Sequence, residues 1–401
     1  MGYEVSQGVA MNATIETKTL RAALSVVAPA VPKTSSIPAL LCARVRLLPK
    51  QSGDPYYPQM LEICCAGPDA RITAEIPCRA NGKVKQDLLL PMKTALRLVK
   101  LFDGRETRIS RLSKTAVKII TDDCEYRLDT PDPADFPEAM KIEPKPDVSA
   151  RFAGHELVSM LHAVRYAAYC PSHKRCVFQS VLFDFSDAWL RLVSSDNRRL
   201  AMVERKLDKA TAGTAQYVVP VAAVDMITRA LAAQARENAA VEVRLTNDHI
   251  TVTCSECHGV ESLEFRAKLL DRVYPNYRQV IQDLESRTRL SVDRKDFLRA
   301  VQRISLIAQD PSAFGMVLSF DEAMVIRSVD GRAIERVTAL SFSGDKVEVR
   351  LDPRYVLDFL KAADDETIHM QVGWVGQPIC LADGESGHAC YIDIASMRSV
   401  S

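Results

Sequence analysis

Three stretches of the chain share one pattern, in which a short β-branched run stops at a proline or an aspartate and an amphipathic helix begins. The stretches are residues 88–102, 217–231 and 349–363. Pro91, Pro220 and Asp352 fall in one column, about 130 residues apart. Proline suits the first turn of a helix because its φ is fixed, and an aspartate there caps the helix. The pattern therefore predicts the same strand–helix unit three times.

Apolar positions after that column recur at the spacing of one buried helical face. The aligned sets are Ala95, Val224 and Val356, then Leu98, Ile227 and Phe359, then Phe102, Leu231 and Ala363. An earlier helix in each repeat has apolar residues at i, i+3, i+4 and i+7. Its three copies contain Leu20, Ala23, Leu24 and Val27, then Leu157, Met160, Leu161 and Val164, then Phe297, Ala300, Val301 and Ile304. Each repeat thus has two amphipathic helices.

Short alternating runs bounded by turn residues lie between and after the helices, as in SVLFDF followed by WLRLVSSD. Such runs are typical of antiparallel hairpins, so each repeat is predicted to be α+β, with two helices packed on an antiparallel sheet. We expect three domains, at residues 11–147, 148–286 and 287–401, after a disordered extension at residues 1–10. The joints around Pro131 and Pro275 are rich in proline, which favours fixed angles between repeats.

Composition limits what the surface can do. Fifty-two Lys and Arg against 51 Asp and Glu leave a formal charge of +1, so affinity of the whole surface for nucleic acid is not supported. No apolar run is long enough to cross a membrane and no secretion signal opens the chain, so we expect a cytoplasmic protein. The opening Met1-Gly2 matches the minimal myristoylation pattern, which is too short to carry weight.

Basic residues are nevertheless concentrated on the predicted helices, whereas the acidic residues of these helices lie mostly in or before the first turn, where the helix dipole favours them. The basic set is Lys18, Arg21, Lys93, Arg97, Lys100, Arg165, Arg229, Arg236, Lys295, Arg299, Arg303, Arg354 and Lys361. Such a bias in a chain of near-zero net charge indicates a surface that faces phosphates. No zinc-finger spacing, helix-turn-helix signature or stacking platform accompanies it, so the predicted contact is with the nucleic-acid backbone and is indifferent to sequence.

One cysteine motif suggests a different class of function. Cys254-Ser-Glu-Cys257-His258 matches a c-type haem attachment pattern, and a redox or metal enzyme built on it is an alternative hypothesis. A structural zinc site would need a second ligand pair, which the sequence lacks at usual spacing. The other reading is a hairpin end with reduced thiols, as the odd total of eleven cysteines suits. With no phosphate loop or nucleophile elbow, we expect no catalysis, cofactor or metal.

From Met11 to Arg398 the chain resembles the bacterial sliding clamp, the β subunit of DNA polymerase III. The resemblance is carried by Asp132–Pro137, Leu190–Ala201, Phe265–Val280, Tyr355–Lys361 and Ser396–Arg398. It implies a non-catalytic processivity factor, a homodimer whose three-domain subunits form half each of a six-domain ring around double-stranded DNA. Helices would line the hole, and DNA polymerase III, the clamp loader and repair proteins would bind through short peptides.

The resemblance also assigns site residues. Arg175 joins the DNA-facing set. The peptide pocket would be lined by Phe178, Ser195, Asn197, Arg198, Leu200, Pro275, Val280, Pro378 and Met397. Asn197 stands where the family has glycine and can adopt the same left-handed turn, whereas Arg198 replaces a histidine and charges one edge. The C-terminal end also departs from the family pattern. A clamp-like scaffold with altered partner binding is therefore a further alternative.

Overall fold

The computed structural model describes residues 11–49, 59–81, 87–138, 146–168, 177–186, 188–207, 214–234, 239–255, 257–282, 287–307, 315–374, 376–384, 387–392 and 396–399. The chain divides into two compact units. The first comprises Met1–Val158 with Asp225–Leu269, and the second comprises Ser159–Val224 with Leu270–Ser401. The chain passes from one unit to the other within helix α3 (Gly154–Arg165), within helix α4 (Val221–Gln234) and again between Leu269 and Leu270.

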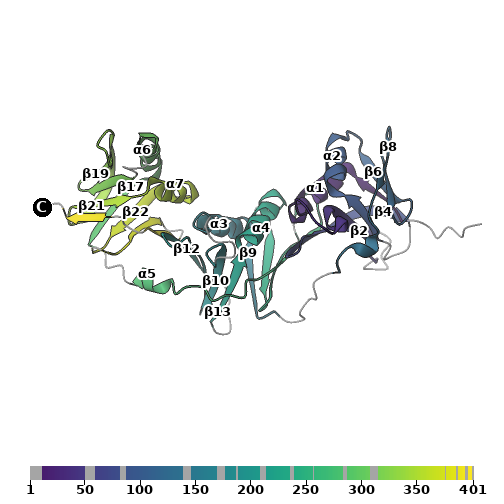
Figure 1. Cartoon of the computed structure of the whole chain (residues 1–401), viewed down its shortest axis with the longest axis horizontal. Coiled ribbons are helices and arrows are strands. Elements are labelled where there is room, and N and C mark those ends of the chain that lie inside the picture. Colours follow the sequence, from purple (N-terminus) through teal and green to yellow (C-terminus); the bar gives the residue numbers. More distant parts are fainter. Residues whose placement is uncertain are drawn as a thin grey trace, which may run out of the picture. The chain divides into compact units, whose positions relative to one another are not determined.

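The first unit is built on one antiparallel sheet of twelve strands, in which the path β8-β7-β6-β1-β4-β16-β15-β14-β9 is joined by β2, β3 and β5. The strands are β1 (Asn12–Glu16), β2 (Cys42–Leu47), β3 (Gln59–Ala66), β4 (Ala70–Asn81), β5 (Asp87–Pro91), β6 (Glu106–Arg111), β7 (Ala116–Ile120), β8 (Glu125–Asp129), β9 (Val148–Ala153), β14 (Ala240–Leu245), β15 (His249–Cys254) and β16 (Ser262–Lys268). Helices α1 (Thr17–Val27) and α2 (Met92–Leu101) lie side by side against it (Figure 1). Short 3-10 turns occur at Ala28–Ala30, Pro38–Leu41 and Pro133–Asp135.

The second unit contains an antiparallel sheet of thirteen strands in the order β13-β10-β11-β12-β24-β23-β22-β17-β20-β19-β18-β21-β25. They are β10 (Ser180–Ser186), β11 (Trp189–Ser195), β12 (Arg199–Lys206), β13 (Ala215–Pro220), β17 (Thr288–Asp293), β18 (Met316–Phe320), β19 (Ala323–Ser328), β20 (Ile334–Gly344), β21 (Val347–Leu351), β22 (Thr367–Val372), β23 (Ile379–Asp383), β24 (His388–Ile392) and β25 (Ser396–Ser399). Its helices include α5 (Arg278–Gln282), α6 (Arg294–Ile307) and α7 (Pro353–Ala362), of which α6 and α7 contact each other.

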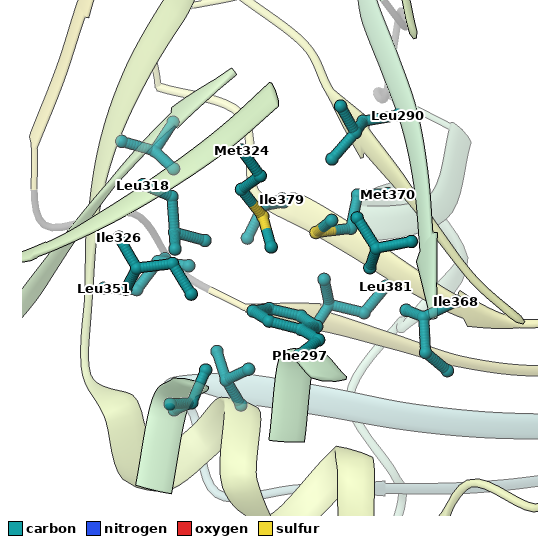
Figure 2. Close-up of a cluster of buried hydrophobic side chains, with 14 of the residues drawn as sticks. Leu290, Phe297, Leu318, Met324, Ile326, Leu351, Ile368, Met370, Ile379 and Leu381 are labelled. Atoms are coloured by element: carbon teal, nitrogen blue, oxygen red, sulfur yellow. The ribbon is translucent and has the colours of Figure 1, made fainter. Parts of the chain in front are cut away.

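Burial follows the predicted helical faces. Phe297 of α6 is fully buried among strand side chains of the third repeat, and Figure 2 shows it beside Leu381 and Ile368. Val356 and Phe359 of α7 enter the same core. These observations, with the antiparallel sheets, confirm the predicted α+β fold.

The strand–helix boundary differs slightly from the prediction. Pro91 and Pro220 are the last residues of β5 and β13, one position before the helix rather than inside its first turn. Asp352 does cap α7, because its side chain accepts a hydrogen bond from the backbone N–H of Arg354 at 2.9 Å. Residues 1–10 lie outside the described residues.

The sheets do not stop at the predicted repeat boundaries. In the first unit β16 of the second repeat pairs with β4 of the first, with Phe265 opposite Ile72. In the second unit β12 of the second repeat pairs with β24 of the third, with Leu200 opposite Tyr391. Strand pairing across repeats explains why each compact unit contains part of the second repeat.

Candidate functional site

The exposed side of α2 carries a basic stripe. Lys93, Arg97 and Lys100 are exposed, at a spacing that places them on one side of the helix, whereas Ala95 and Val99 on the other side are fully buried. Lys18 on α1 is exposed too. No ion pair within the described part of the chain involves these four cations. Their charges are therefore available to an anionic ligand.

Other members of the predicted basic set make contacts inside the protein. Arg21 donates from Nη2 to the backbone oxygen of Phe102 at 2.8 Å and from Nε to that of Val99 at 3.3 Å, so it satisfies carbonyls at the end of α2. Arg303 holds Glu335 with two parallel hydrogen bonds of 2.7 and 2.8 Å. These arginines are partly committed to structural contacts.

Some of the remaining cations of the set also contact other groups of the protein, whereas others have no ion pair among the described residues. Arg354 pairs with Asp352 at 2.7 Å, and Arg299 lies 3.9 Å from Asp296. Arg229 is exposed and donates to a backbone carbonyl of its own helix. Lys295 and Lys361 are both exposed and, like Arg229, have no ion pair among the described residues. Arg175 and Arg236 lie outside the described residues.

The predicted pocket turn connects β11 to β12. Asn197 has φ +71°, the left-handed conformation expected from its place in the turn. Ser195 accepts a hydrogen bond from the Asn197 N–H at 3.1 Å and donates one to the carbonyl of Arg199 at 2.8 Å. Arg198 is exposed at the tip, whereas Leu200 is buried. The turn is a closed, hydrogen-bonded unit with one charged side chain facing outward.

A buried residue beside this turn was missed by the sequence analysis. The side chain of Arg199 is only 6% exposed and lies between the rings of Tyr166 and Tyr355, at 5.2 and 4.8 Å from their centroids. Burial alone lowers its pKa, but the hydrogen bond to Asp358 and the charge of Asp196 outweigh burial and hold the pKa of Arg199 above its usual value. The residue is a fixed cation.

The joint that follows the second repeat is attached to β10 by a buried carboxylate. Asp184 is fully buried and accepts hydrogen bonds at one oxygen from Tyr277 at 2.6 Å, Arg278 at 3.0 Å and Gln216 at 3.1 Å. Burial and the Asp184 hydrogen bond raise the pKa of Tyr277 to about 12. The joint is thus held in place by specific polar contacts, which the sequence could not show.

Two of the predicted pocket residues, Leu200 and Phe178, adjoin one apolar cluster. Leu200 packs with Tyr274 and Tyr277 of the joint and with Val177, and the ring of Phe178 meets that of Tyr274 edge-on at 6.5 Å.

The other predicted lining residues are less closely connected. Pro275 and Val280 are exposed beside the joint, and Pro378 is half-buried before β23. Met397 lies on β25, opposite Val349 of β21, and its side chain is outside the described residues.

The cysteine motif forms the end of the β15–β16 hairpin. The sulfur atoms of Cys254 and Cys257 are 3.1 Å apart and buried, and His258 is exposed. Within the residues that the structure describes, no three potential metal ligands are grouped. In the same residues no helix has the length and apolar character needed to span a bilayer. The cysteine motif thus has the hairpin-end arrangement.

Comparison with solved structures identifies the class of fold. The chain is similar to the DNA polymerase sliding clamp from Bacillus subtilis, with a TM-score of 0.84 at 20% identity over 96% of this chain and 99% of that one. It is equally similar to the sliding clamp from Pseudomonas aeruginosa bound to griselimycin, with a TM-score of 0.84 at 18% identity over 96% of this chain and 100% of that one. The fold is that of a DNA sliding clamp.

Sequence comparisons find similarity to one family. Residues 282–397 match the family model for the DNA polymerase III beta subunit, C-terminal domain. A beta sliding clamp from Rickettsia bellii is 22% identical over 93% of this chain and 96% of its own length. Residues 282–397 thus match the DNA polymerase III beta subunit family, and the chain as a whole is similar to beta sliding clamps.

Proposed function

We propose that two copies of this chain close into a ring around duplex DNA and tether the replicative polymerase to it. The protein would be a non-catalytic processivity factor. The observation that carries this proposal is the strand pairing between repeats. It occurs twice inside the chain, and it leaves one strand with an open edge in the first repeat and one in the third.

The internal junctions have a common construction. In the first, residues 70–75 of β4 pair with β16, and residues 79–81 of β4 pair with β1, the strand before the first helix of its repeat. In the second, residues 199–203 of β12 pair with β24. Both junctions are antiparallel and join a middle strand of one repeat to a late strand of the next.

The third repeat presents the same middle strand with an open side. Residues 339–344 of β20 pair with β17, the strand before α6, as β4 pairs with β1. Residues 334–338 of β20 pair with β19 on one side, and no described strand occupies the other. In the first repeat, the late strand β8 pairs only with β7 among the described strands. Pairing of β20 with β8 of a second copy would complete the series and remove both open edges.

Apolar side chains adjoin this open edge. Leu306 and Ile307 at the end of α6 are 69% and 48% exposed, and Ile334 at the start of β20 is 53% exposed. Three large aliphatic side chains at one end of a repeat are typical of an interface core. A head-to-tail dimer would cover them, with the repeats 11–147, 148–286 and 287–401 serving as its domains.

The basic helices supply the proposed DNA-facing surface. Phosphate contacts from Lys18, Lys93, Arg97 and Lys100 would carry no sequence information and would weaken with salt. Such contacts permit sliding, and the closed ring supplies the attachment. The remaining cations predicted for this surface are proposed to act in the same way.

The turn and joint supply the proposed partner site. Leu200, Tyr274 and Tyr277 provide an apolar base, and Pro275 and Val280 are exposed beside it. A short peptide with a hydrophobic anchor fits this chemistry. We propose the polymerase III catalytic subunit, the clamp loader and repair proteins as its sources, in a cytoplasmic replication complex.

Retention on DNA tests the proposal. The protein would be assembled on a nicked circular plasmid and on the same plasmid after linearisation. We expect long retention on the circle and rapid loss from the linear form, with a solution mass of two chains. Equal release from both DNAs would overturn the topological account, and a peptide titration would separate a clamp from a scaffold that has lost polymerase binding.

A further inference from the structure

We propose that Arg199 is a positioning residue that holds the peptide-binding turn in place from α7 of the third repeat. The inference rests on the proposed peptide site. It assigns to the Asp196–Arg199–Asp358 series a role in partner binding, although none of these side chains needs to touch the peptide.

The turn depends first on the carboxylate of Asp196. Its Oδ1 accepts hydrogen bonds from the backbone N–H groups of Arg198 and Arg199, at 2.9 and 3.0 Å. The left-handed Asn197 lies between these anchoring contacts. If the Asp196 side chain rotates, the two amides lose their acceptor and the tip of the turn is no longer fixed.

Asp196 is in turn oriented by Arg199. Its Oδ2 accepts a hydrogen bond from Nε of Arg199 at 3.1 Å. Because the two side chains are 11% and 6% exposed, water competes little for this contact. Arg199 thus determines which way the carboxylate faces.

Arg199 is held from two other elements. Its Nη1 donates to Asp358 of α7 at 2.8 Å, and its Nη2 donates to the carbonyl of Tyr166, just after α3, at 3.0 Å. The ring of Tyr355 on α7 covers the guanidinium. Each of the three guanidinium nitrogens therefore donates a hydrogen bond, and α7 supplies both a charge and a ring.

The alternation of side chains along β12 places the contacts of Arg199 and the proposed peptide on opposite faces of the sheet. Consecutive residues on a strand point to opposite faces, so Arg199 faces α3 and α7, whereas Leu200 faces the joint cluster. The turn is consequently fixed from the side opposite the proposed peptide. A change on a helix of the third repeat should alter partner binding in the second.

We call the contacts that run from Asp358 through Arg199 to Asp196 the relay. Asp358→Ala is the variant that tests it. Asp358 is 39% exposed and alanine favours a helix, so α7 should remain folded. The matched control is Glu204→Ala, which removes the acid from another arginine pair on β12, with Arg191 at 3.0 Å, without touching the relay. Asp358→Glu supplies the conservative variant.

Two readouts are needed. Amide hydrogen exchange would follow the N–H groups of residues 197–199, and fluorescence anisotropy would measure the affinity of a labelled clamp-binding peptide from the polymerase III catalytic subunit. For Asp358→Ala we expect faster exchange and about tenfold weaker peptide binding, the size expected when a charge-assisted hydrogen bond is lost. Asp358→Glu should restore part of both, and Glu204→Ala should change neither.

The outcomes separate this inference from the proposed function. Unchanged exchange and unchanged affinity in Asp358→Ala would overturn the relay while leaving the clamp intact. If exchange accelerates but affinity does not change, the link to partner binding is wrong. If the natural protein binds no peptide, the proposed partner site fails and the inferred effect on binding fails with it, while exchange still decides whether α7 holds the turn.

Discussion

Closure of the proposed ring should depend on the side chain of Leu306. This side chain is 69% exposed at the end of α6, so its loss should disturb the fold of a single chain very little. In a head-to-tail dimer the same side chain would be buried twice, once at each of the two identical junctions. Leu306→Ala is therefore expected to weaken dimerisation while leaving the subunit folded.

The magnitude follows from the exposed surface. Full burial of a leucine side chain is worth about 1.5–3 kcal/mol, and roughly two thirds of that remains to be gained by Leu306 at a junction. Truncation to alanine should thus cost about 1–2 kcal/mol per junction, or about 2–4 kcal/mol for the closed ring. This corresponds to a dimer dissociation constant that is roughly thirty-fold to several hundred-fold larger.

Sedimentation velocity over a dilution series would measure this constant. Val273→Ala is the control, because Val273 is 91% exposed in the joint and is part of neither open edge strand. We expect the control to dimerise like the natural protein. An unchanged dissociation constant for Leu306→Ala would refute the assignment of the α6 end to the junction.

Three other changes test the site and its supports. Asp184→Ala removes the acceptor of the Tyr277 hydroxyl and should lower the free energy of unfolding by about 2–4 kcal/mol in urea denaturation; no loss would exclude a supporting role for this contact. Arg97→Gln should reduce the slope of log binding constant against log salt for DNA by about 0.9 if Arg97 contacts a phosphate, whereas Arg303→Gln should change it less because Glu335 already holds Arg303. Burial raises the pKa of Asp383, but His388, whose Nδ1 lies 3.9 Å away, and hydrogen bonds from two backbone amides outweigh burial and leave that pKa below the usual value. The ionised Asp383 carboxylate therefore stabilises the folded chain at pH values above the pKa of the unfolded carboxyl group, and this stabilisation is lost as pH falls through the lower pKa of the folded chain. The free energy of unfolding should thus fall less steeply below about pH 4 in Asp383→Asn than in the natural chain.

Local patterns predicted the repeated helices well. The aligned apolar positions became buried helical faces, as at Val356 and Phe359, and the aspartate before α7 became a cap. Asn197 adopted the left-handed turn expected of it. These features depend on backbone geometry within a few residues, which sequence spacing reports directly.

The partners of the charged side chains could not be predicted in this way. Arg198 and Arg199 are adjacent and alike, yet one is exposed at the turn and the other is buried against α7. Glu335 lies 32 residues from Arg303 in sequence. No local pattern records which distant element will face a given side chain.

The sequence alone determined that one strand-and-helix unit recurs three times, because helical and strand periods are properties of the local chain. It also determined that basic residues are concentrated on the helices. Only the tertiary structure decided which cations remain available, where β4 and β12 continue into the next repeat, and which strand edges stay open. Those outcomes depend on contacts between residues far apart in the chain, and such contacts form only when the sheets and helices have packed together.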